Sequence, residues 1–182
     1  MAHIKTVGLV WIRKVMREKG PEVENVFLAR LTPEERTTLE QAFPVSTAPI
    51  ETVTDILYKA AEMLFPGDPL AVRKLLRGEA RNDLTGIYRV LLHVVSIEYA
   101  VKQAALLWKT YNKKGEAHIE RPPEGGNRLI EVVTGYPDMY WPFAEVNAGY
   151  IEGVMEMTGA KDVAVECDLR DPEAWKWIVT WR

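Results

Sequence analysis

The stretch Pro142–Trp181 decides the fold; it reads PFAEVNAGYIEGVMEMTGAKDVAVECDLRDPEAWKWIVTW. From Pro142 or Phe143 to Thr158 the apolar residues recur at helical spacing. Gly159 follows directly, and glycine is the residue that most often ends an α-helix. The stretch therefore opens with a helix.

Two strands are predicted after that helix, at Asp162–Cys167 and Trp175–Trp181, because apolar and polar residues alternate there. Two further alternating runs precede it, at Glu116–Glu120 and Arg128–Thr134, joined by the turn-rich loop RPPEGGN. A meander of about four strands cannot bury both of its faces alone, so we expect the late helix to cover one face.

The chain before Gly115 is predicted to be helical. Thr32-Pro33-Glu34-Glu35 has the form of a capping box, with a proline in the first turn. Val45–Pro49 is expected to be a connector. The expected helices are Thr6–Lys19, Glu22–Leu31, one from Thr32 that ends before Pro44, Glu51–Phe65, one capped by Asp68, Asp83–Val95 and Ile97–Tyr111 after Ser96.

These elements predict an α+β domain in which a helical first two-thirds packs on a small antiparallel sheet of about four strands with one late helix. We expect one domain, 1–182, because no long linker, repeat or low-complexity tract divides the 182 residues.

Composition narrows the function classes. Apolar residues make up 47% and the net charge is −3, which gives no electrostatic reason to expect nucleic acid. No apolar run is long enough to span a membrane and the start does not resemble a signal peptide, so the cytoplasm is the expected location. The single cysteine, Cys167, excludes an intrachain disulfide.

The order strand–strand–helix–strand–strand, with "GYIEGVMEMTGA" at Gly149–Ala160, resembles the 4-vinyl reductase domains, which share a fold with subunits of the TRAPP vesicle-tethering complex. The chain is also similar to an uncharacterised, myxobacterial-type family of unknown function. That similarity rests on Gly20-Pro21-Glu22 with Leu31-Thr32-Pro33-Glu34, on Asp83–Leu92, and on Leu107-Trp108, Tyr111 and Gly115.

The resemblance implies a bacterial sensor with an aromatic, acyl or tetrapyrrole-type ligand, and a homodimer formed through helices. The 4-vinyl reductase domains commonly end with two cysteines that help to hold zinc. Here Cys167 matches the first, but Ala174 and Trp175 stand where the second would be. Tetrahedral zinc needs four donors, so we expect no metal and no cofactor.

Aromatic residues supply the candidate ligand pocket. The segment "GYPDMYWPF" at 135–143 is rich in aromatics, which suit the mouth of a pocket, a dimer contact or a loop pinned to the core. Tryptophans in the last strand would fill one sheet face or form a cavity wall. The candidate pocket residues are Tyr136, Tyr140, Trp141, Phe143, Tyr150, Met155 and Trp177.

His93 and Cys167 are weaker candidates. His93 lies in an apolar helix and could be a haem or metal ligand, but no second ligand lies at helical spacing, and such a histidine is more often a core residue hydrogen-bonded to a backbone carbonyl. Cys167 is flanked by Glu166 and Asp168, whose charges oppose an activated thiolate.

Three hypotheses for the function remain. The first is a small-molecule binding or sensing domain that works as a homodimer. The second is an interaction module of the TRAPP-like type, since helices such as Leu84–Val95 and Ile97–Leu107 carry apolar residues on more than one face. The third, a tetrapyrrole-modifying enzyme, ranks last because no nucleotide loop, nucleophile elbow or His-Glu-x-x-His pair is present. On the first hypothesis an unknown partner protein would have to read the output.

Overall fold

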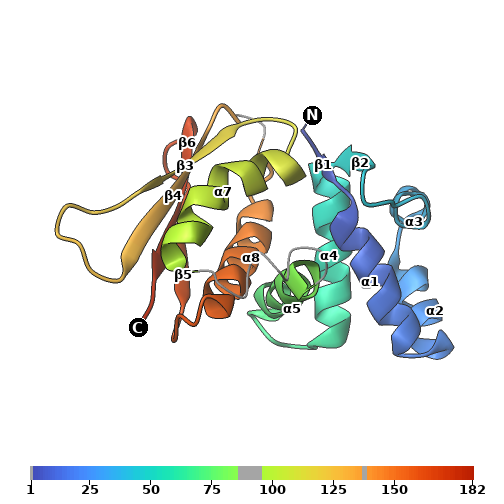
Figure 1. Ribbon diagram of the computed structural model, residues 1–182. Helices are drawn as coiled ribbons and strands as arrows, with labels where there is room; N and C mark the ends of the chain where they lie inside the picture. Colours follow the sequence, from blue (N-terminus) through green and yellow to red (C-terminus); the bar gives the residue numbers. More distant parts are fainter. Residues whose placement is uncertain (1, 86–95, 137–138) are drawn as a thin grey trace.

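The computed structural model describes residues 2–85, 96–136 and 139–182, with the backbone alone at 83–85 (Figure 1). It confirms the α+β class. In chain order the elements are β1 (His3–Lys5), α1 (Val7–Glu18), α2 (Pro21–Arg30), α3 (Pro33–Glu40), β2 (Thr47–Pro49), α4 (Ile50–Leu64), α5 (Ala71–Thr85), α7 (Ile97–Tyr111), β3 (Glu116–Glu120), β4 (Arg128–Thr134), α8 (Phe143–Met157), β5 (Ala164–Asp168) and β6 (Ala174–Thr180).

The predicted four-stranded sheet is present. Its order is β3-β4-β6-β5 and every neighbouring pair is antiparallel. The helices α7 and α8 lie against the same face of this sheet, and α5, α4 and α1 form further layers behind them (Figure 1). The inner face buries Leu129, Val133, Trp175, Trp177 and Val179, which strand alternation brings to one side.

The helix α8 sits unusually close to α5. A side chain on Gly149 would place its Cβ 2.6 Å from the Cα of Arg73, and one on Gly153 would place its Cβ 2.7 Å from the Cβ of Ala80. These two glycines, four residues apart on one face of α8, therefore let the two helices approach backbone to backbone.

Ion pairs run along the same interface. Arg73 contacts Glu145 at 2.6 Å and Glu152 at 2.9 Å, while Arg77 contacts Glu152 at 2.6 Å. Glu152 is 2% exposed, so its charge is buried and held by two guanidinium groups. Burial alone would lower the pKa of Arg73, but the carboxylates of Glu145 and Glu152 outweigh it and raise that pKa.

The N-terminal part adds a feature that the sequence did not predict. β1 and β2 form a two-stranded antiparallel sheet, so the segment expected to be a connector, Val45–Pro49, contains a strand. The predicted capping box is confirmed: Thr32 Oγ1 accepts from the amide of Glu35 at 3.2 Å, and Glu35 accepts from the amide of Thr32 at 2.6 Å.

Most predicted helices are confirmed within a few residues at each end. The exception is the region after Ala71, where α5 continues without a break through the predicted helix start at Asp83. The rest of the predicted helix Asp83–Val95 lies outside the described residues. No described helix has the length and apolar character needed to cross a bilayer.

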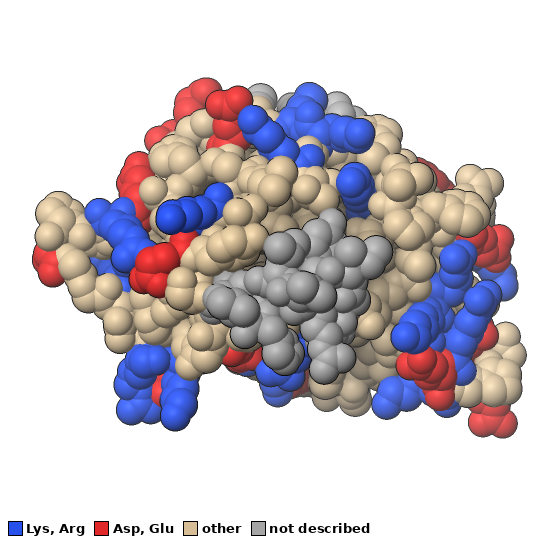
Figure 2. All heavy atoms as spheres, viewed as in Figure 1, with Lys and Arg blue, Asp and Glu red and all other residues tan. Residues whose placement is uncertain are grey.

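Figure 2 shows charges of both signs interspersed over one face of the described surface. Opposite charges also meet between neighbouring helices: the side chains of Arg17 in α1 and Glu24 in α2 approach to 3.1 Å.

Candidate functional site

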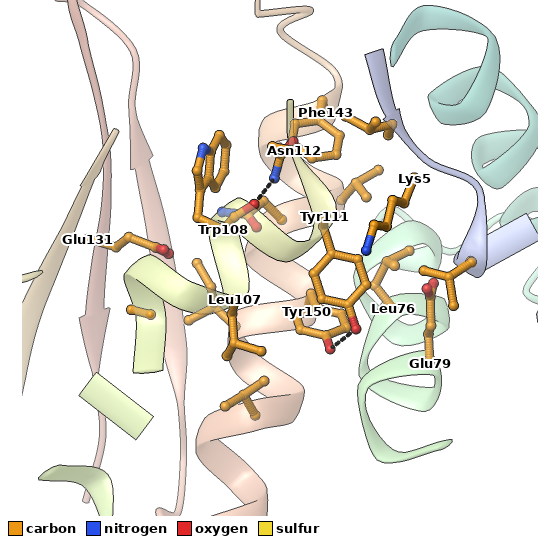
Figure 3. Close-up of a pocket in the computed structure, with 18 of the residues that line it drawn as sticks. Lys5, Leu76, Glu79, Leu107, Trp108, Tyr111, Asn112, Glu131, Phe143 and Tyr150 are labelled. Atoms are coloured by element: carbon orange, nitrogen blue, oxygen red, sulfur yellow. Dashed lines mark hydrogen bonds between the residues drawn. The ribbon is translucent and has the colours of Figure 1, made fainter. Parts of the chain in front are cut away.

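A cavity of about 140 Å³ lies between the sheet and the helical layers (Figure 3). Its lining comes from β1, the start of α1, α4, α5, α7, α8, β3 and β4, so it is assembled from segments far apart in the sequence. The wall is mainly apolar; representative residues are Val53, Leu57, Leu76, Val101, Leu107 and Ile151.

Trp108 of α7 anchors the aromatic side of the wall. Its indole Nε1 donates to the carbonyl of Lys114 at 2.9 Å, so the ring carries no unsatisfied donor. It meets Phe143 edge-on at 6.4 Å between ring centroids and Trp177 at 6.2 Å. This cluster ties α7 to the sheet and to the start of α8.

A pair of tyrosines connects α7 to α8 across the cavity. The hydroxyl oxygens of Tyr111 and Tyr150 lie 3.1 Å apart, and the two rings meet at an angle of 61° (Figure 3). The polar ends of both residues thus face each other within a largely apolar wall.

Glu131 brings a carboxylate into the cavity from the sheet (Figure 3). It is 8% exposed and lies on the inner face of β4, between Leu129 and Val133. Burial raises the pKa of Glu131 to about 7, and the neighbouring amide of Asn147 offsets only part of that effect. Near neutral pH this carboxyl group can therefore exchange a proton.

One buried amide oxygen in the lining has no hydrogen-bond partner among the described residues. It is Oδ1 of Asn112. Asn112 is 8% exposed, and its own Nδ2 donates to the carbonyl of Trp108 at 3.3 Å (Figure 3). Buried polar atoms of this kind are uncommon in native proteins and indicate a place where a ligand or water completes the bonding.

The opposite end of the cavity holds the remaining charges. Lys5 of β1 and Glu79 of α5 lie on the helical side, whereas Glu131 lies on the sheet side (Figure 3). Glu79 packs on Gly8, where a Cβ would come within 2.6 Å of its Oε1. Among the described lining residues, the charges are thus distributed asymmetrically: a lysine and a glutamate lie at one end and one glutamate lies at the other.

Three of the sequence-predicted pocket residues, Phe143, Tyr150 and Met155, line this cavity. Tyr136 is buried outside the lining and packs edge-on against Trp108 at 5.8 Å. The others also lie outside it: Tyr140 bonds Asp55 at 3.3 Å, Trp141 is 61% exposed, and Trp177 is fully buried in the core, donating to the carbonyl of Ala144.

The polar residues of the cavity were missed. Glu131 has a signal in the sequence, since strand alternation places it on the same face as Leu129 and Val133, where a charge is out of pattern. Lys5 and Glu79 have no such signal, because their position in the lining depends on how β1 and α5 pack.

Cys167 and His93 have different outcomes. Burial and the nearby Glu145 raise the pKa of the Cys167 thiol to about 12, so it is not an activated nucleophile. His93 lies outside the described residues. Within the described ranges, no group of three His, Cys, Asp or Glu side chains is arranged to hold a metal ion.

The fold defined by these elements is that of the H-NOX domains. The chain superposes on an H-NOX protein from K. algicida with a TM-score of 0.67 and 11% identity, over 98% of this chain and 96% of that one. An H-NOX protein from S. oneidensis in the Fe(II)NO ligation state gives 0.65 and 13%, over 96% and 98%. An oxygen-binding H-NOX domain related to soluble guanylate cyclases gives 0.52 and 12%, over 78% and 76%.

The sequence itself matches no known family model and no curated protein. The resemblance to 4-vinyl reductase domains, to TRAPP subunits and to a myxobacterial-type family is therefore wrong: no family model matches, and H-NOX proteins match over nearly the whole chain. The order strand–strand–helix–strand–strand occurs in more than one fold, so it could not distinguish between them.

Proposed function

We propose that this protein is a small-molecule-binding domain of the sensor type, with the ligand held in the cavity between the sheet, α7 and α8. The observation that carries the proposal is the cavity itself: a mainly apolar space bounded by several elements, with a few polar atoms directed into it. Concave apolar sites with a small number of polar groups are the usual form of ligand pockets. The H-NOX fold supports the proposal, because structures with this fold are described with haem and with bound oxygen.

The size of the cavity favours a small ligand. An apolar cavity of about 150 Å³ engineered into another protein binds benzene or xenon. A volume of about 140 Å³ is comparable. We therefore infer a ligand the size of a single ring or a short acyl chain.

The described residues of the cavity do not fit a haem. The described lining contains no imidazole or thiolate to bind iron, and its charged groups are Lys5, Glu79 and Glu131. Two carboxylates against one ammonium form a poor surface for the two propionates of a haem. We derive no haem chemistry for this chain.

The helix α7 is the element that ligand binding would affect most. Trp108 is its only fully buried residue, and its inward-facing Val101, Ala104 and Leu107 border the cavity instead of a filled core. A ligand in the cavity would bury these side chains and stabilise α7 against the rest of the domain. The position or stability of α7 would then report occupancy to a partner protein.

The test is a titration of the purified protein with toluene, indole and benzyl alcohol, followed by calorimetry and by amide hydrogen exchange. We expect saturable binding at one site per chain, with slowed exchange concentrated in α7. The variant Ala104→Phe fills the cavity from α7 and should abolish binding.

Leu106→Phe is the matched control. It adds the same ring to the same helix, but Leu106 is 62% exposed, so binding should be unchanged. Absence of binding by every probe, or equal binding by Ala104→Phe and the native chain, would refute the proposed function.

A further inference from the structure

We propose that the cavity selects a small apolar molecule that carries a protonated amine or amidine, with the carboxylate of Glu131 as its counter-ion. This inference rests on the proposed function and names the chemical class of the ligand.

The surroundings of Glu131 are apolar on the sheet. Its partner on β3 is Ile119 and its partner on β6 is Trp177, and both share its face because they are directly opposite in the register. Leu129 and Val133, two residues away on β4, occupy the same face. No side chain on this part of the described sheet offsets the charge of the carboxylate.

Among the described residues, the helices α7 and α8 above the sheet do not supply a counter-charge either. The lining residues that α7 and α8 contribute are apolar or neutral, and the titratable ones are the hydroxyls of Tyr111 and Tyr150. Asn147 is the polar neighbour that favours the ionised carboxylate. The charged lining residues Lys5 and Glu79 lie at the far, helical end (Figure 3).

A cation is the group that completes this arrangement. A carboxylate buried without an opposite charge is costly, whereas an ion pair in a water-poor site is strong. The α5–α8 interface shows how this chain otherwise treats a buried glutamate: Glu152 is held by Arg73 and Arg77 at 2.9 and 2.6 Å. At Glu131 the described residues provide no such partner, and the side chain faces a cavity large enough for one ring.

The apolar walls of the cavity indicate the second part of the ligand, its hydrocarbon portion. Trp108 and Leu107 lie on the Glu131 side of the cavity in Figure 3, and Phe143 adds further apolar surface to the wall. A molecule that fits both features has one ring or a short hydrocarbon chain, with the positive charge at one end. Benzylamine is the simplest probe of that description.

The test is calorimetric titration at pH 8 with three probes of equal size: benzylamine, benzyl alcohol and benzoate. We expect benzylamine to bind at least tenfold more tightly than benzyl alcohol, and benzoate to bind least. Because burial raises the pKa of Glu131 to about 7, benzylamine should bind roughly tenfold more weakly at pH 5.5, where the carboxyl group is mostly protonated.

The variant Glu131→Gln should lose the preference for benzylamine and its pH dependence while it still binds benzyl alcohol. Glu166→Gln is the matched control: Glu166 lies on β5 of the same sheet and is exposed, so the preference should remain. If Glu131→Gln does not fold, the pH profile of the native chain and the comparison of the three probes still decide whether the cavity prefers a cation.

The outcomes separate the two proposals. Benzyl alcohol that binds as tightly as benzylamine, or a preference that persists in Glu131→Gln, overturns the cation inference and leaves the binding function standing. Failure of all three probes overturns the binding function together with the inference.

Discussion

The two long sides of α8 are filled in opposite ways. Toward α5, Gly149 and Gly153 bring the two backbones into contact, and Arg73 and Arg77 bind the buried Glu152. Toward α7, the same helix presents Tyr150 and other side chains to a cavity. One helix therefore joins a closely packed interface to one that borders a cavity.

The largest expected loss of unfolding free energy comes from placing a side chain in the close contact between α5 and α8. Gly149→Val would place a branched side chain 2.6 Å from the Cα of Arg73, so the helices must separate. We expect a loss of about 4 kcal/mol or more of unfolding free energy, beyond ordinary overpacking because backbone atoms are in the way. Denaturant unfolding measures it.

Gly78→Ala is the control for that substitution. Gly78 is also helical, but its new Cβ would meet Trp11 at an ordinary 3.4 Å. It should be neutral or stabilising by up to about 1 kcal/mol. Equal losses at Gly78 and Gly149 would contradict the close approach of the helices.

The second largest loss of unfolding free energy is expected from removing the buried ion pairs between α5 and α8. Glu152→Ala leaves Arg73 and Arg77 partly buried without their shared carboxylate. We expect a loss of about 3 kcal/mol, measured by thermal and denaturant unfolding. Glu156→Ala is the comparison. Because the side chain of Glu156 is 26% exposed, its removal should lower the unfolding free energy by less than about 1 kcal/mol.

The third prediction concerns the carboxylate on the cavity side. The pKa of Glu131 is about 7 in the folded protein, above its ordinary value of 4.5, so the folded state retains a proton that the unfolded state releases. Unfolding free energy should therefore fall as the pH rises from about 4.5 to 7, by on the order of 3 kcal/mol. Unfolding curves of the native chain and Glu131→Gln at several pH values isolate this contribution. An unchanged pH slope in the variant would show that Glu131 is not the group responsible.

The smallest expected change in unfolding free energy is an increase. Filling the cavity with Ala104→Phe should stabilise the unliganded domain by about 1 kcal/mol, because the new ring buries apolar surface that now borders an empty space. Leu106→Phe, on the exposed face of α7, should change stability by less than about 0.5 kcal/mol. A loss of stability in Ala104→Phe would mean that the space is too small for a ring.

Local order was predictable because it depends on neighbouring residues. The capping box at Thr32 and Glu35, the end of α8 before Gly159, and the alternation of β4 and β6 all follow from short-range rules. The pairing of β1 with β2 was not predictable, since three-residue strands that meet across more than forty positions leave little pattern. The related fold was not predictable either, at 11–15% identity to the solved H-NOX structures.

The sequence by itself determined the helices, the four-stranded sheet and the α+β class, because backbone periodicity and turn residues act over a few positions. Of the seven residues that the sequence suggested for a pocket, two aromatic residues, Phe143 and Tyr150, and Met155 line the cavity. Only the tertiary structure decided that Glu131 faces that cavity without a cationic neighbour among the described residues. The physical reason is that burial, charge compensation and empty space belong to the packing of distant elements, and no window of the chain contains them.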